Sequence, residues 1–227
     1  MKTIVIIGGS KGIGNAIVNI LLNECLVINI SRTNPSLIHK NFTHYNCNIL
    51  IDELPEIQNV DSLIYCPGSI NLKPFERLKL DDFKKDYEIN FLGAVRAIQK
   101  YLPNLKESKN SSILLFSTVA SKLGMPFHTS VASVKSAIEG LVKSLAAEYA
   151  PNIRVNAIAP TVTDTTLASK LLRNDRQKEQ MIERHPLKKY LNVEEVATMA
   201  AFLISEKALS MSGQIFQMDC GITSLKI

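Results

Sequence analysis

The stretch that decides the fold is Thr3-Ile4-Val5-Ile6-Ile7-Gly8-Gly9-Ser10-Lys11-Gly12-Ile13-Gly14. Its first five residues are β-branched, so they predict a β-strand. Gly8 and Gly9 end that strand abruptly, because glycine favours tight turns. After the turn, residues 13–22 carry apolar side chains at helical spacing, and residues 26–30 form a second apolar run. This part of the chain therefore predicts a strand, a glycine-rich turn, a helix and a strand.

The same alternation continues along the chain. Further strands are expected at residues 62–65, 113–116, 153–157 and 214–218, and helices at residues 80–102, 131–149 and 193–204. Strands that are solid apolar runs, alternating with helices, indicate a parallel sheet covered on both faces. We therefore expect residues 1–227 to form a single Rossmann-type, doubly wound α/β domain. Ligands of such sheets bind at the carboxyl ends of the strands.

The composition is that of an ordinary soluble globular protein, with 46% apolar and 21% charged residues among 227. No apolar run is long enough to span a bilayer, and the first residues lack the features of a signal peptide, so we expect a cytoplasmic protein without membrane contact. Four cysteines are far apart and form no CxxC pair, which argues against disulfides and against a metal site. Cys47 and Cys66 end apolar runs, so we expect them to be buried free thiols.

A net charge of +5 raises the question of nucleic-acid binding. The basic residues are dispersed, and the one dense group, residues 173–189, also contains Asp175, Glu179 and Glu183. A solvated helix face explains that group better than a nucleic-acid surface does. A phosphate-bearing cofactor or an acidic small-molecule substrate would use the positive charge equally well.

The glycine-rich turn between the first strand and helix is a candidate phosphate site. Gly8, Gly12 and Gly14 would let the backbone approach a pyrophosphate, and the helix N-terminus would offer free N–H groups and a positive dipole end. Residues 8–12 also match the Gly-x-Ser-x-Gly nucleophile elbow of hydrolases. That elbow normally follows several strands and needs a histidine, and none of the four histidines has a supporting context. A turn without a ligand is the other alternative, and the dinucleotide interpretation is favoured over both.

The end of the second strand indicates which dinucleotide binds. NAD-binding turns usually have an acidic residue about 20 residues after the glycines. Residues 29–34 contain no acid, and Arg32 lies in that region. Arg32 can pair with a 2′-phosphate, and Lys11 can add a second positive charge, although either could also be a plain surface cation. Their joint placement favours NADP(H).

The chain resembles the short-chain dehydrogenase/reductases of the classical type along nearly its whole length. The Thr-Gly-x-x-x-Gly-x-Gly motif is present with Ile7 in place of the threonine, and Asn90 and Lys135 match catalytic positions of the family. Later matches include the segment 154–160, read as Arg-Val-Asn-Ala-Ile-Ala-Pro, and the pairs Pro186-Leu187 and Gly213-Gln214. Where the family continues with glycine after the proline, this chain has Thr161.

The resemblance implies roles for particular residues. It implies catalytic roles for Asn90, Thr118, Lys135 and His128. It implies cofactor contacts from Gly8, Ser10, Lys11, Gly12, Ile13, Gly14, Arg32, Asn48, Gly68, Asn90, Lys135, Pro160, Val162 and Thr165. It also implies a substrate lid at about residues 166–185 and a homodimer or homotetramer formed through the two long helices.

The departure from the family pattern is at the proton donor. The family has a tyrosine four residues before the lysine, and counting back from Lys135 gives Val131, which cannot donate a proton. Two interpretations follow: an NADP(H)-dependent oxidoreductase with a modified site, acting on a carbonyl, alcohol or enone, or a catalytically silent NADP(H)-binding protein. His128 matches the tyrosine position of the family's enoyl-thioester reductases, or is a plain loop residue; water relayed through Asn90 and Lys135 is a further source. Because Asn90, Thr118 and Lys135 are retained, we favour the oxidoreductase.

Overall fold

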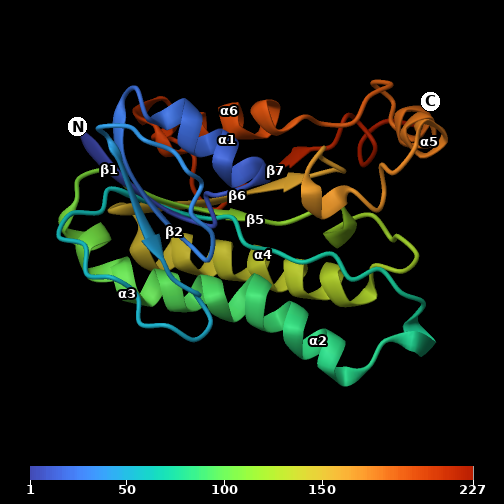
Figure 1. Cartoon of the computed structure of the whole chain (residues 1–227), viewed down its shortest axis with the longest axis horizontal. Helices are drawn as coiled ribbons and strands as arrows, with labels where there is room; N and C mark the ends of the chain where they lie inside the picture. The colour runs from blue at the N-terminus through green and yellow to red at the C-terminus, as the bar shows by residue number, and fades with distance from the viewer. Residues whose placement is uncertain (227) are drawn as a thin grey trace.

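In a computed structural model, which describes residues 1–226, seven parallel strands form one sheet between two layers of helices (Figure 1). The strand order is β3-β2-β1-β4-β5-β6-β7. The strands are β1 (Lys2–Ile7), β2 (Cys25–Ser31), β3 (Phe42–Asn46), β4 (Ser62–Tyr65), β5 (Ser111–Phe116), β6 (Ile153–Pro160) and β7 (Ile215–Met218). The predicted doubly wound α/β fold is confirmed.

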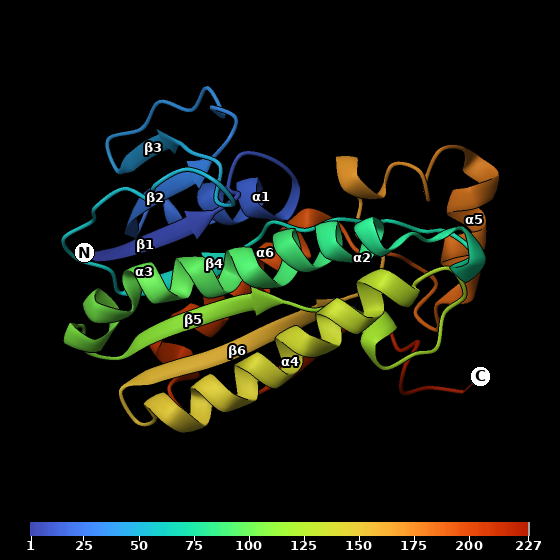
Figure 2. The same ribbon diagram turned by 90° about the horizontal axis from the view of Figure 1, so that it is seen from below.

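The helices are divided between the two faces of the sheet. In Figure 1, α1 (Gly12–Leu21) and α6 (Val193–Ile204) lie on one face, and α2 (Leu80–Tyr87), α3 (Gly93–Glu107) and α4 (Thr129–Tyr149) lie on the other. Figure 2 shows α5 (Asp175–Arg184) beyond the carboxyl ends of the strands, away from both layers. Single helical turns are η1 (Phe75–Arg77), η2 (Glu88–Leu92), η3 (Val119–Ser121), η4 (Thr166–Ala168) and η5 (Glu206–Ala208).

Two separate apolar cores follow from the alternation of side chains along each strand. In β1, Val5 and Ile7 pack toward α3 and α4, whereas Ile4 and Ile6 pack toward α1 and α6. Both sets are fully buried, which is why the strand is apolar at every position. The helices meet each core with one apolar side, such as Ile17 and Val18 of α1.

The prediction of one continuous helix over residues 80–102 is wrong in two respects, because the helical segment is interrupted and ends later. The one-turn π-helix η2 separates α2 from α3, and α3 continues to Glu107. Two side chains donate hydrogen bonds to backbone carbonyl groups at this interruption. The Tyr65 hydroxyl donates to Ile89 O at 2.6 Å, and Asn90 Nδ2 donates to Asp86 O at 2.8 Å. Tyr65 can approach because Gly93 has no side chain; a Cβ there would lie 2.2 Å from the tyrosine oxygen. Periodicity does not reveal such a π-turn.

The sequence prediction missed β3. Its residues, Phe-Thr-His-Tyr-Asn, are mostly polar, and none of them is fully buried. The strand lies at the edge of the sheet and pairs only with β2. An edge strand needs no continuous apolar run, so the pattern that revealed the central strands is absent here.

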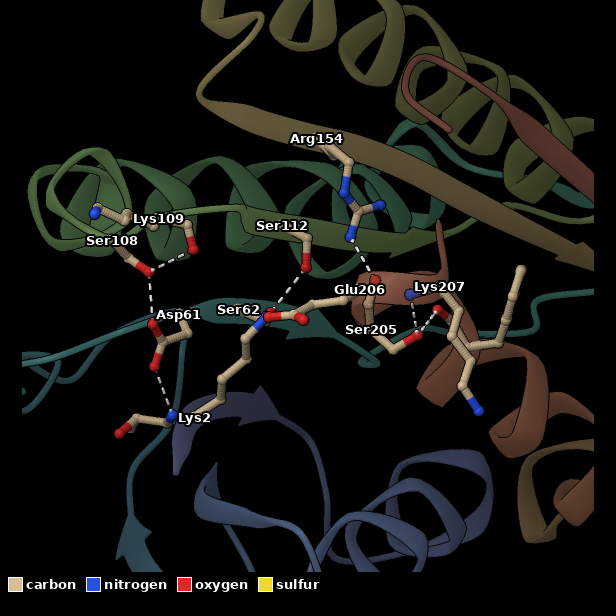
Figure 3. Close-up of polar contacts among 12 residues, drawn as sticks. Lys2, Asp61, Ser62, Ser108, Lys109, Ser112, Arg154, Ser205, Glu206 and Lys207 are labelled. Atoms are coloured by element: carbon tan, nitrogen blue, oxygen red, sulfur yellow. Dashed lines mark hydrogen bonds and ion pairs between the residues drawn. The ribbon is translucent and has the colours of Figure 1, made fainter. Parts of the chain in front are cut away.

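Polar side chains join the strands at the amino edge of the sheet (Figure 3). Asp61 accepts hydrogen bonds from the Thr3 amide at 2.7 Å and from the Ser108 hydroxyl at 2.5 Å. The buried Arg154 of β6 donates to Leu203 O at 2.9 Å. These contacts tie the amino ends of the strands together, whereas ligands of parallel sheets bind at the carboxyl edge.

The four cysteines are free thiols, as expected. Cys47 is buried as predicted, whereas Cys66 is only partly buried at the residue level. None of the helices in residues 1–226 combines the length and apolar character that crossing a bilayer requires.

Candidate functional site

Two cavities of about 220 Å³ each lie at the carboxyl edge, where the strand order reverses between β1 and β4. The first, the glycine-turn cavity, is lined by Gly8, Ser10, Lys11, Arg32 and Asn48, among others. The second, the lid cavity, is lined by Ile13, Thr118, His128, Val131, Lys135, Pro160, Val162 and Thr165, among others. Gly68 lines both, so the two cavities meet at this residue. The fold thus brings together nearly all the residues that the sequence indicated as candidates.

The glycine turn has the shape that an anion cradle needs. Gly8 and Gly12 have φ of +82° and +53°, which L side chains rarely adopt. Gly14 lies against the turn, and a Cβ there would be 2.3 Å from Gly8 O. Lys11 precedes α1, and its side chain does not cap the helix. The first N–H groups of the helix therefore have no hydrogen-bond partner from that side chain. A pyrophosphate fits this place.

Asn29 of β2 holds the glycine turn in place through hydrogen bonds, and the sequence analysis did not identify it. Its Oδ1 accepts the Gly9 amide at 2.8 Å, and its Nδ2 donates to Ser10 Oγ at 3.1 Å. Ser10 Oγ also contacts Ser31 Oγ and Thr33 O, so it holds the turn to the end of β2. The available signal was a polar residue inside an otherwise apolar strand, since Asn29 is completely buried.

The glycine-turn cavity is positively charged at its rim. Lys11 and Arg32 are both exposed there, and its lining within the described residues includes no aspartate or glutamate. Asn48 uses its Oδ1 to accept the Leu50 amide at 3.1 Å, which leaves its Nδ2 available to a ligand. This charge pattern suits a phosphate better than a free ribose diol.

Lys135 is buried, although lysine is usually a surface residue. Only 8% of it is exposed, and its Nζ donates to Phe116 O at 2.8 Å. Burial lowers the pKa of Lys135 to about 8, because desolvation disfavours the ammonium form. The side chain reaches the lid cavity from the second turn of α4.

Asn90 lies beside Lys135 in the same buried region. Its Nδ2 donates to Asp86 O and to Ser69 Oγ, both at 2.8 Å, so it links the helix interruption to the loop after β4. Its Oδ1 is buried and has no partner among the described residues. A Cβ built on Gly68 would lie 3.2 Å from that oxygen and 3.7 Å from Lys135 Nζ. The unpaired acceptor and the lysine therefore converge on the point where the two cavities meet, as a bound ligand or water would require.

Asp86 is a second buried polar group that the sequence did not indicate. Its carboxylate is 2% exposed and accepts hydrogen bonds from Ser69 Oγ at 2.5 Å and Ser130 Oγ at 2.6 Å. Its charge also acts on Lys135 and favours the ammonium form, although less than burial disfavours it. The cluster fixes the loop after β4 against the first turn of α4.

The remaining candidates surround the lid cavity. Thr118 caps η3, and its neighbour Ser117, which also lines the cavity, donates to Glu139 Oε1 at 2.6 Å. Val131 is buried and lines the cavity from the first turn of α4. His128 precedes that helix, is partly buried, and has its Nδ1 2.7 Å from Pro126 O.

Thr165 links the lid to the glycine turn. It precedes η4 and accepts the Ala168 amide through its side chain, while its Cγ2 would lie 3.2 Å from a Cβ on Gly12. Pro160 ends β6, and Val162 follows it in the cavity wall. The predicted lid, residues 166–185, corresponds to η4, α5 and the loop between them.

Comparisons with known proteins identify the family of the chain. The family model described as Enoyl-(Acyl carrier protein) reductase matches residues 47–223. A tropinone reductase homolog of Arabidopsis thaliana is 30% identical, over 98% of this chain and 91% of its own length. The solved structure of ElxO with NADP bound has a TM-score of 0.90 and 25% identity, and the match covers 99% of each chain. A 4-hydroxyisoleucine dehydrogenase complexed with NADH also has a TM-score of 0.90 and 25% identity, over 100% of each chain. The chain belongs to the short-chain dehydrogenase/reductase family of oxidoreductases.

Proposed function

We propose that the chain is an NADP(H)-dependent oxidoreductase that acts on a carbonyl, alcohol or enone of a small molecule. The observation that carries the proposal is the convergence of Lys135 Nζ and the unpaired Asn90 Oδ1 on Gly68, where the two cavities meet. A protein that used the dinucleotide only as a structural element would have little use for a buried lysine at this end of the site. When bound, the nicotinamide supplies or accepts an electron pair as hydride.

Residues at three places in the chain bind the cofactor in this proposal. The glycine turn and the start of α1 hold the pyrophosphate through backbone N–H groups. Arg32 and Lys11 hold the 2′-phosphate, and Asn48 offers its amide to the adenine. At the other end, Lys135 binds the nicotinamide ribose, while Pro160, Val162 and Thr165 contact the carboxamide.

The lid cavity accommodates the substrate beside the nicotinamide. Its wall is mostly apolar, with contributions from Ile70, Met125, Leu167, Leu171 and Met181. Thr118 offers a hydroxyl that can polarise a carbonyl oxygen. Val131 stands where the family has its tyrosine, so the proton must come from elsewhere in the cavity.

A homodimer or homotetramer formed through α3 and α4 is part of the proposal.

The preference for NADP(H) is tested by titrating NADPH and NADH against Arg32→Ala. Loss of one charged hydrogen bond costs about 1.5–3 kcal/mol, so the Kd for NADPH should rise roughly 10- to 100-fold while that for NADH stays the same. Lys40→Ala removes an exposed cation that does not line either cavity and is the matched control. Equal affinity of the wild type for the two cofactors would refute the preference.

Catalysis is tested by NADPH turnover on a panel of carbonyls and enones, with wild type and Val131→Tyr compared. A measurable wild-type rate supports the proposal. If the wild type binds NADPH but is inert on the whole panel, and Val131→Tyr gains activity, the chain is a silent NADP(H)-binding protein instead.

A further inference from the structure

A buried threonine–histidine pair lies in the wall of the lid cavity. Thr161 and His185 are 8% and 1% exposed, and the distance from Thr161 Oγ1 to His185 Nε2 is 2.7 Å. Both residues line the same cavity as Val131 and Lys135. A hydroxyl in contact with an imidazole inside a ligand cavity is an arrangement that moves protons in many enzymes.

The surroundings of His185 fix its orientation. The residue follows the last residue of α5, and its Nδ1 lies 2.5 Å from Met181 O in the last turn of that helix. A carbonyl oxygen can only accept, so Nδ1 carries a hydrogen and donates it to Met181 O. In the neutral ring Nε2 is therefore an acceptor, and the Thr161 hydroxyl donates to it.

Protonation of His185 reverses the direction of the second hydrogen bond. Nε2–H then donates to Thr161 Oγ1, and the threonine hydrogen is free to point into the cavity. The last turn of α5 carries the partial negative charge of a helix C-terminus, and Met181 O in that turn contacts the ring. Thr161 Oγ1 has no second partner among the described residues that would compete for its hydrogen.

We propose that Thr161 and His185 form the acid–base pair that supplies the proton to the substrate oxygen, in place of the missing tyrosine. This inference rests on the proposed function. During reduction, the carbonyl carbon takes the electron pair as hydride from NADPH, and the carbonyl oxygen takes the hydrogen of Thr161 Oγ1. The threonine oxygen simultaneously takes the hydrogen of His185 Nε2, so imidazolium becomes neutral imidazole and no alkoxide remains. Oxidation of an alcohol runs through the same atoms in reverse.

The pair is better placed for this role than His128. His128 is only partly buried, its Nδ1 lies against Pro126 O of its own loop, and it has no hydroxyl partner. His185 is completely enclosed and is oriented at both ring nitrogens. An acid that is held in place and kept from bulk water transfers its proton more effectively than one in an exposed loop.

The first test uses the wild type alone and does not depend on a substrate. Histidine labelled with ¹⁵N gives distinct NMR signals for the two neutral tautomers, and His185→Gln assigns the signal of interest. We expect the Nδ1–H form for His185, and a change of its Nε2 signal in Thr161→Val. A neutral His185 with hydrogen on Nε2, or a signal that Thr161→Val leaves unaltered, would overturn the proposed pair.

The second test compares single-turnover reduction by NADPH across variants. Thr161→Val and His185→Gln should each lower the rate roughly 100-fold or more, since a positioned general acid contributes ~10²–10⁴-fold, while the Kd for NADPH stays within about twofold. Thr161→Ser keeps the hydroxyl and should recover most of the rate. His128→Ala, in the wall of the lid cavity, should lower the rate less than Thr161→Val does, and the exposed control Thr198→Val should leave it unchanged.

The outcomes separate this inference from the proposed function. If the wild type is active and Thr161→Val does not lower its rate, or if only His128→Ala lowers it, the proposed acid–base pair is wrong. The proposed oxidoreductase function is then unaffected. A wild type that binds NADPH but reduces nothing overturns both.

Discussion

Replacement of Lys135 by methionine should make the cofactor-free protein more stable at pH 7. The pKa of Lys135 falls from its usual 10.5 to about 8 in the folded protein because the side chain is buried. At roughly 1.4 kcal/mol for each pH unit, the buried charge costs about 3 kcal/mol at pH 7. Methionine loses the hydrogen bond to Phe116 O, worth about 1 kcal/mol. The net gain is about 2 kcal/mol, or a rise in Tm of about 4–8 °C.

The pH dependence distinguishes this cause from better packing. In the wild type, the unfolded state binds more protons than the folded state between pH 8 and 10.5, so the free energy of unfolding rises with pH across that window. The penalty is complete below about pH 8 and is relieved as the pH rises toward 10.5. The advantage of Lys135→Met should therefore be largest at pH 7 and should disappear by about pH 10.5.

The assay is urea denaturation followed by circular dichroism at pH 7, 9 and 10.5 without cofactor. Lys143→Met replaces an exposed lysine on the same helix and should show no such pH-dependent difference. Lys135→Met should at the same time bind NADPH more weakly. A variant that is less stable than the wild type at pH 7, or a stability difference that does not change with pH, would refute this reasoning.

Three glycine substitutions test the geometry more simply. Gly14→Ala should weaken NADPH binding at least tenfold in fluorescence titration, because its Cβ would lie 2.3 Å from Gly8 O and the turn must move. Gly93→Ala should lower the free energy of unfolding by roughly 2–4 kcal/mol in urea denaturation, since Tyr65 must leave its buried place. Gly140→Ala, with nothing within 4 Å on a helix surface, should instead raise it by roughly 0.5–1 kcal/mol; a loss of stability there would show that the helix is not as open as described.

The sequence by itself determined the central strands, the glycine turn and most of the candidate site. Local chemistry was sufficient for these, because strands buried on both faces must be apolar throughout and a turn of positive φ needs glycine. The candidate cofactor residues could be predicted for the same reason: they follow strand ends, and the topology brings strand ends together. The edge strand β3 was not predicted, because its residues are only partly buried and therefore do not form a continuous apolar run.

Only the tertiary structure decided how the polar groups pair. The burial of Lys135, the unpaired Asn90 Oδ1 and the contacts of Asp86 depend on residues far apart in sequence, and no local pattern encodes them. The same is true of Thr161 and His185, which lie 24 residues apart and meet because α5 ends beside the end of β6. A hydrogen bond needs its two atoms within about 3 Å, and that condition is set by packing rather than by spacing along the chain.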